Sequence, residues 1–189
     1  MIITLLFGVF ALVIVAAALA PLESLGWWAW SGSKPADPDN LEAMAEAQGV
    51  EEPDKDFYLV YLSGIGAISG TSIPDEEYPF IHALEERLTN CEVISDIYPY
   101  SVTNNGLTGQ RVFAGVWRQV EKLRLKNPNS ALAMIVNVRN IFQLFVSADR
   151  RYGPIYNLGI ANELMRGLIR HGYRPIKRKP VVLLGWSGG

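Results

Sequence analysis

Short apolar runs alternate along the chain with longer stretches in which apolar residues recur every three or four positions. Residues 57–62 (FYLVYL) and 181–184 (VVLL) are continuous apolar runs, a pattern typical of parallel strands that are buried on both faces. Residues 92–98 (EVISDIY) predict a further strand, which ends where Pro99 follows it. We therefore expect strands that lie far apart in the sequence.

The stretches between these runs have the spacing of amphipathic helices. Phe80, Leu84 and Leu88 lie four residues apart, and the charged residues between them predict a solvent-facing side. Helices are also predicted by the apolar spacing in residues 113–124 and by the proline and glycine that bound residues 154–172. Strands separated by such helices predict an α/β fold, with a mostly parallel sheet, right-handed crossovers and helices on both faces.

The apolar segment at residues 131–148 is nearly long enough to cross a bilayer, but Arg139 lies in its middle. An arginine at the centre of a membrane costs about 3 kcal/mol or more. The segment therefore predicts a soluble helix, or a strand followed by a helix.

Residues 1–20 carry no charged side chain, and a helix of this length spans about 30 Å, the thickness of the hydrocarbon core of a bilayer. They predict an uncleaved transmembrane anchor and a single-pass membrane localisation. A cleaved signal peptide is the alternative, because residues 18–20 (ALA) have the small side chains of a cleavage site. The lack of a basic residue before the run and the position of Pro21 favour the anchor. The predicted partner is the lipid bilayer, contacted by residues 1–20 and by three tryptophans at its interface, Trp27, Trp28 and Trp30.

Residues 21–56 hold these tryptophans and then a stretch rich in Pro, Ala, Asp, Glu and Gly. This composition predicts an interfacial segment and a linker, with one short helix-capable piece at residues 41–48. The folded domain is then expected at residues 57–189.

Charge is strongly divided between the two halves of the chain. The net charge is −2, but residues 1–96 hold 16 acidic and 3 basic side chains, whereas residues 97–189 hold 3 acidic and 14 basic ones. The halves can neutralise each other where they pack, or the basic helices can face anionic lipid head groups. Nucleic acid is not expected as a partner, because no recognised binding motif accompanies the basic residues. The single cysteine, Cys91, cannot form an internal disulfide.

Residues 185–189 read GWSGG and match the pattern G-x-S-x-G directly after an apolar strand. In that pattern the chain turns sharply from a strand towards a helix and holds the serine in a strained conformation. Gly185 and Gly189 lie two positions either side of Ser187, where glycine lets neighbouring backbones approach. The sequence thus marks Ser187 as a candidate nucleophile.

With this motif and this order of elements, residues 57–189 resemble the N-terminal half of an α/β-hydrolase domain of the lipase and esterase kind. The resemblance implies that Ser187 is the nucleophile and that the backbone N–H of Gly188 forms part of an oxyanion hole. A second N–H, from Gly64 or Ile65 in the loop after the first strand, would complete that hole. No cofactor or metal is expected.

The family supplies its acid and then its histidine after the serine, whereas His82 and His171 both precede Ser187. Each histidine is expected to have an ordinary structural role. The 189-residue chain is therefore expected to be catalytically inert on its own and to be a fragment of a longer protein. The expected function is that of a membrane-anchored serine hydrolase acting on an ester, thioester or amide.

Two alternatives compete with this interpretation. A non-catalytic, membrane-anchored α/β module would bind lipid or a protein partner, with GWSGG serving only as a turn. A dinucleotide-binding fold would use Gly64, Gly66 and Gly70 after the first strand. That fold requires a helix that begins within the glycine run and an acidic residue about twenty positions later, and Asp96 lies about thirty positions away.

Overall fold

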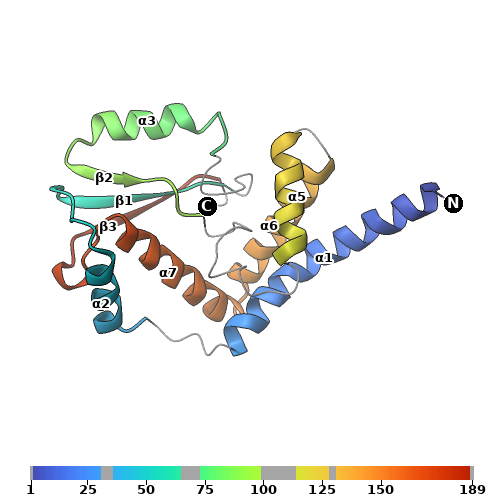
Figure 1. The fold of residues 1–189 in the computed structure, drawn as a ribbon, viewed down its shortest axis with the longest axis horizontal. Coiled ribbons are helices and arrows are strands. Elements are labelled where there is room, and N and C mark those ends of the chain that lie inside the picture. The colour runs from blue at the N-terminus through green and yellow to red at the C-terminus, as the bar shows by residue number, and fades with distance from the viewer. Residues whose placement is uncertain (1, 31–35, 65–72, 99–113, 128–130, 188–189) are drawn as a thin grey trace.

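The computed structural model describes residues 2–30, 36–64, 73–98, 114–127 and 131–187 (Figure 1). Its strands are β1 (Phe57–Leu62), β2 (Cys91–Ile94) and β3 (Val181–Gly185). Its helices are α1 (Ile2–Trp30), α2 (Pro38–Gln48), α3 (Tyr78–Arg87), α5 (Ala114–Lys126), α6 (Ala131–Ala148), α7 (Gly153–Arg170) and the short 3-10 helix η1 (Pro175–Lys177).

The strands form one parallel sheet in the order β2-β1-β3. In the central strand β1, Tyr58 is in register with Glu92 of β2 on one side and with Val181 of β3 on the other. Parallel neighbours need crossover connections, and α3 lies between β1 and β2 while α5, α6 and α7 lie between β2 and β3. The prediction of an α/β fold with a parallel sheet is confirmed, although β2 ends at Ile94 and is shorter than the strand expected at residues 92–98.

Helices cover both faces of the sheet, with α3 on one side and α7 on the other (Figure 1). Val60 of β1 packs in a cluster with Leu168 of α7, whereas Tyr61 packs in a cluster with Ile81 of α3. Successive side chains of a strand point to opposite faces, so this arrangement buries β1 on both sides. The continuous apolar run FYLVYL is the sequence signature of that position.

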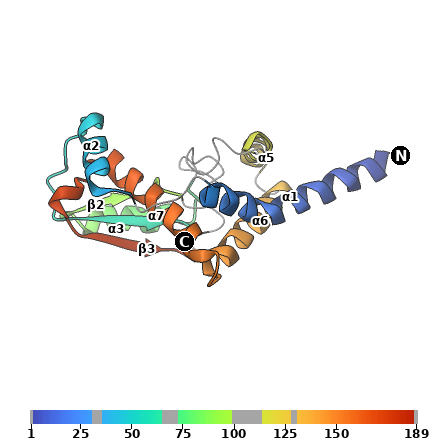
Figure 2. The same cartoon turned by 90° about the horizontal axis from the view of Figure 1, so that it is seen from below.

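The helices α1, α5 and α6 pack together at one end of the molecule, beside the sheet (Figure 2). Ala17 of α1 is fully buried there, in one cluster with Trp117 of α5 and Ile135 of α6. Residues 131–148 form a single helix, which is one of the two outcomes that the sequence predicted. Arg139 in that helix is only 1% exposed, and its guanidinium carbon lies 5.2 Å from the centre of the Trp117 ring. The arginine is therefore part of the packing between α5 and α6.

Among the residues that the structure describes, no helix combines the length and the apolar character needed to cross a membrane. This finding overturns the prediction of a transmembrane anchor at residues 1–20 and of a single-pass membrane localisation. The sequence argument counted apolar length alone and did not foresee that part of the run packs within the chain, where Ala17 and Val13 contact a cluster with Trp117 of α5 and Ile135 of α6. Nearer its N-terminus α1 leaves large apolar side chains exposed, among them Leu5, Phe7 and Leu12.

The bilayer contact predicted for residues 1–20 and the three tryptophans depended on that anchor. The helix α1 continues past Pro21 and ends at Trp30, so Trp27 and Trp28 lie within it. The side chains of the three tryptophans lie outside the part of the chain that the structure describes.

The helix-capable piece predicted at residues 41–48 corresponds to α2. This helix ends at Gln48 and is capped by Gly49, whose φ of +62° is a left-handed conformation that glycine adopts without strain. Glu42 of α2 accepts hydrogen bonds from Arg174 Nε at 2.6 Å and from the backbone N–H of Ile176 at 3.1 Å. This part of the predicted linker therefore packs against the chain that leads from α7 to β3.

Candidate active site

The Ser187 turn, which consists of Trp186 and Ser187, follows β3 directly at the C-terminal edge of the sheet. Ser187 is exposed and has a φ of +55°, in the left-handed region that non-glycine residues avoid. Holding a side-chain-bearing residue in that region costs about 1–2 kcal/mol. The strained serine that the sequence motif implies is therefore present in the described chain.

Contacts on two sides hold Trp186. Its backbone N–H donates to the carbonyl oxygen of Leu62 at 2.9 Å, which continues the pairing between β1 and β3. Its indole ring packs against Phe80 of α3, with ring centres 5.6 Å apart. The turn before Ser187 is thereby fixed to both the sheet and α3.

Gly64, in the loop after β1, lies against the Ser187 turn. A Cβ atom placed on Gly64 would lie 3.1 Å from the carbonyl oxygen of Trp186 and 3.2 Å from Cβ of Ser187. Both distances are tighter than ordinary van der Waals contact, so only glycine lets the two backbones approach this closely without a shift. The structure thus brings together two of the predicted site residues, Ser187 and Gly64.

The other predicted site residues are placed less fully. Gly185 is the last residue of β3, where it is in register with Leu62 of β1. Ile65, Gly188 and Gly189 lie outside the described residues.

A buried carboxylate that the sequence argument did not single out lies close to this edge of the sheet. Glu77, at the N-cap of α3, is 3% exposed. Its Oε2 accepts hydrogen bonds from Ser63 Oγ at 2.6 Å and from the Tyr61 hydroxyl at 2.8 Å. Burial raises the pKa of the Tyr61 hydroxyl above its ordinary value, and the hydrogen bond to Glu77 raises it further.

Sequence pattern alone gave little signal for Glu77. It is the last residue of PDEE, and acidic residues in this position were interpreted as favourable charges at a helix N-terminus. Asp75 and Glu76 are exposed, so nothing in the acidic run distinguishes the buried member from its neighbours. The distinguishing feature is the pair of hydroxyl groups on β1, which only the fold brings near.

The two histidines have other partners. His82 on α3 is mostly exposed, and its Nδ1 lies 3.5 Å from Oε2 of Glu85. His171, after α7, lies with Nε2 2.8 Å from Oδ1 of Asp96. That hydrogen bond is the main reason why the pKa of the Asp96 carboxyl is below its usual value. Among the described contacts, neither histidine is joined to Ser187.

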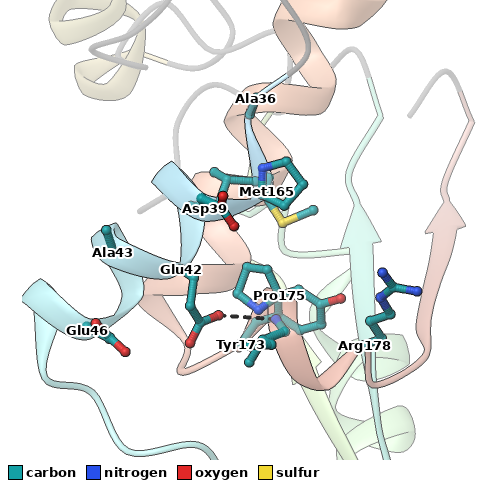
Figure 3. Close-up of a pocket in the computed structure, with 12 residues that line it drawn as sticks. Ala36, Asp39, Glu42, Ala43, Glu46, Met165, Tyr173, Pro175 and Arg178 are labelled. Atoms are coloured by element: carbon teal, nitrogen blue, oxygen red, sulfur yellow. Dashed lines mark hydrogen bonds between the residues drawn. The ribbon is translucent and has the colours of Figure 1, made fainter.

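A separate pocket of about 600 Å³ lies between α2, the end of α7 and η1 (Figure 3). Met165, Tyr173 and Pro175 line it, together with the acidic side chains Asp39 and Glu42 of α2. Its lining does not include the Ser187 turn. In the described part of the chain, no group of three or more His, Cys, Asp or Glu residues is arranged to hold a metal ion.

The dinucleotide alternative finds little support in this geometry. Gly64 faces the Ser187 turn, and Gly66 and Gly70 lie outside the described residues. The next described helix, α3, begins only at Tyr78, and Asp96 is bonded to His171.

Comparisons of the chain with protein-family models, with curated proteins and with solved structures found no match. The functional argument therefore rests on the residues themselves.

Proposed function

We propose that the Ser187 turn is the nucleophile turn of a serine hydrolase that acts on an ester, a thioester or an amide. The observation that carries the proposal is the strained serine, at φ +55°, next to a glycine on which a Cβ would lie only 3.2 Å from Ser187 Cβ. The resemblance to α/β-hydrolases implies this pairing of a nucleophile after one strand with a close backbone approach after an earlier one.

The chemistry of acyl transfer explains why these two features belong together. The hydroxyl of Ser187 would attack a carbonyl carbon, and negative charge would develop on the carbonyl oxygen. Backbone N–H groups that point at this oxygen stabilise it, and each donor is worth about 3–4 kcal/mol in a preorganised site. The resemblance assigns one such donor to Gly64 or Ile65 after β1 and another to the residue after Ser187. The contact of Gly64 with the Ser187 turn supports the first assignment.

The proposal assigns the general base and the acid to neither His82 nor His171, because no described contact joins either of them to Ser187. In the family that the chain resembles, these groups follow the serine in sequence. The test therefore uses the protein at its natural length rather than an isolated part of it.

The test is labelling by a fluorophosphonate, which reacts with activated serines and leaves a stable adduct. The parent protein is expected to take up one phosphonate, and Ser187→Ala is expected to take up none. Ser147→Ala serves as the matched control, because Ser147 lies at the end of α6 and bonds to Asn157 at 2.8 Å; it should label like the parent. A folded parent that does not label, or labelling that survives Ser187→Ala, would contradict the proposal. A folded parent that does not label would favour the alternative of a non-catalytic α/β module.

A further inference from the structure

We propose that Glu77 is a positioning residue that fixes the backbone after β1 beside the nucleophile, an inference that rests on the proposed function. Its buried Oε2 accepts one hydrogen bond from Ser63, just beyond β1, and one from Tyr61, within β1. A single carboxylate oxygen thus joins the start of α3 to the end of β1. Glu77 acts through Ser63 and need not touch the substrate.

The strength of this connection follows from the burial of the carboxyl group and from the short distances to its two donors. The hydrogen bond from Ser63 Oγ is 2.6 Å long and the one from the Tyr61 hydroxyl is 2.8 Å long. A buried carboxylate that loses its donors is costly, so the folded state strongly favours the arrangement in which both hydroxyl groups remain bonded. Ser63 is itself only 3% exposed, so solvent does not readily replace its bond to Glu77.

The link to catalysis is the residue that follows Ser63. Gly64 lies so close to the Ser187 turn that a Cβ added to it would lie 3.1 Å from the Trp186 carbonyl oxygen and 3.2 Å from Ser187 Cβ. The same helix that carries Glu77 at its N-cap also packs Phe80 against the Trp186 ring. The helix α3 therefore contacts the chain on both sides of the proposed oxyanion site, through Glu77 to Ser63 and through Phe80 to Trp186.

Two substitutions separate positioning from simple stabilisation. Ser63→Ala and Tyr61→Phe each remove one hydroxyl donor from the same oxygen of Glu77. Tyr61 lies within β1, where its backbone is in register with Leu184 of β3, so the strand stays in place without the hydroxyl. Ser63 lies beyond the paired part of β1, which ends with the hydrogen bond from Trp186 to the Leu62 carbonyl oxygen, so the Ser63 hydroxyl holds the backbone between that bond and Gly64.

The measurements are the second-order rate constant for phosphonylation of Ser187, kcat and KM for a p-nitrophenyl ester, and the thermal unfolding midpoint. Ser63→Ala is expected to lower kcat and the phosphonylation rate at least about tenfold, with KM within about twofold, because misplacement of a reacting group by a fraction of an ångström is costly. Tyr61→Phe is expected to lower the unfolding midpoint by a similar amount but the rates by less than about threefold. A merely structural role for Glu77 would make the two variants alike.

Each outcome decides something. A parent that labels at Ser187 and a Ser63→Ala variant that labels equally fast would overturn this inference while the proposed function stands. Equal rate losses in Ser63→Ala and Tyr61→Phe would also overturn it. A parent that does not label overturns the proposed function and this inference with it. If Ser63→Ala does not fold, Glu77→Gln, which keeps the shape but removes the charge, is judged by the same rates.

Discussion

Replacing Gly64 by alanine tests the contact on which the proposed site depends. The new Cβ would lie 3.1 Å from the Trp186 carbonyl oxygen and 3.2 Å from Ser187 Cβ, so at least one neighbour has to move by a few tenths of an ångström. Trp186 is held by its hydrogen bond to Leu62 and by the Phe80 ring. The displacement is therefore expected to fall mainly on the strained Ser187.

The magnitude follows from two effects of different size. Overpacking of this kind costs about 1–3 kcal/mol in stability, and this contact is at the mild end because both distances exceed 3.0 Å. We expect a loss of about 1 kcal/mol, which lowers the unfolding midpoint of a chain of this length by roughly 2–4 °C. The effect on rate should be larger, about tenfold or more, because a 1 Å misplacement in an active site can cost about a hundredfold.

The assay compares fluorophosphonate labelling and thermal unfolding of Gly64→Ala with those of Gly115→Ala. Gly115 in α5 has no heavy atom within 4 Å of an added Cβ, so its alanine variant should label like the parent and be equally or slightly more stable. A Gly64→Ala variant that labels at the parent rate would refute the reasoning. The close approach of the two backbones would then have no bearing on Ser187.

Two further predictions concern stability away from the Ser187 turn. Gly172→Ala should lower the free energy of unfolding by about 2–5 kcal/mol in urea denaturation, because Gly172 has a φ of +81° and an added Cβ would clash with the Glu51 carbonyl oxygen; an effect below about 1 kcal/mol would contradict this. Asp96→Asn should destabilise the protein modestly at pH 6, since the hydrogen bond from His171 lowers the pKa of the Asp96 carboxyl in the folded state. A depressed pKa contributes stability above the unfolded value of about 4 and loses it as the pH falls further, so the gap between variant and parent should close in acid. A gap that widens as the pH falls below 4 would contradict the assignment.

The elements that the sequence predicted well are those whose signal is local. The runs at residues 57–62 and 181–184 became β1 and β3. In β1 the continuous apolar side chains are buried on both faces, as the run predicts. The run of β3 was expected to be buried as well, but β3 lies at the edge of the described sheet and leaves Val182 and Leu183 exposed. The bounds of α7 also follow closely from the proline and glycine at its two ends. Each of these signals lies within a few residues of the feature that it predicts.

The errors concern features that depend on distant partners. The apolar length of residues 1–20 was taken as a membrane anchor, but whether an apolar face is covered by lipid or by another helix depends on residues such as Trp117 and Ile135. The strand predicted at residues 92–98 is too long, since β2 ends at Ile94. Beyond it, Asp96 bonds to His171, and Ile97 packs against Gly167 of α7 instead of continuing the sheet. Long-range contacts of this kind leave no periodic signal in the sequence.

In the candidate site, too, the local sequence marked single residues, whereas their contacts depend on the fold. The motif marked Ser187, the resemblance implied Gly64 or Ile65, and the fold places Gly64 against Ser187. A positive φ alone is weak support for catalysis, since Arg178 has a φ of +51° where it caps the short helix η1. A residue in that capping position commonly adopts the left-handed conformation for structural reasons.

Ser187 differs because the strain coincides with a second requirement. If the turn served only to redirect the chain, glycine at position 187 would adopt a φ of +55° without the cost that serine bears. The strain instead falls on the one residue of the turn with a nucleophilic side chain, at the point where Gly64 leaves the backbone of another strand free to approach. A hydroxyl that attacks a carbonyl next to backbone groups that stabilise an oxyanion would use both features, which is why their coincidence supports the proposed function.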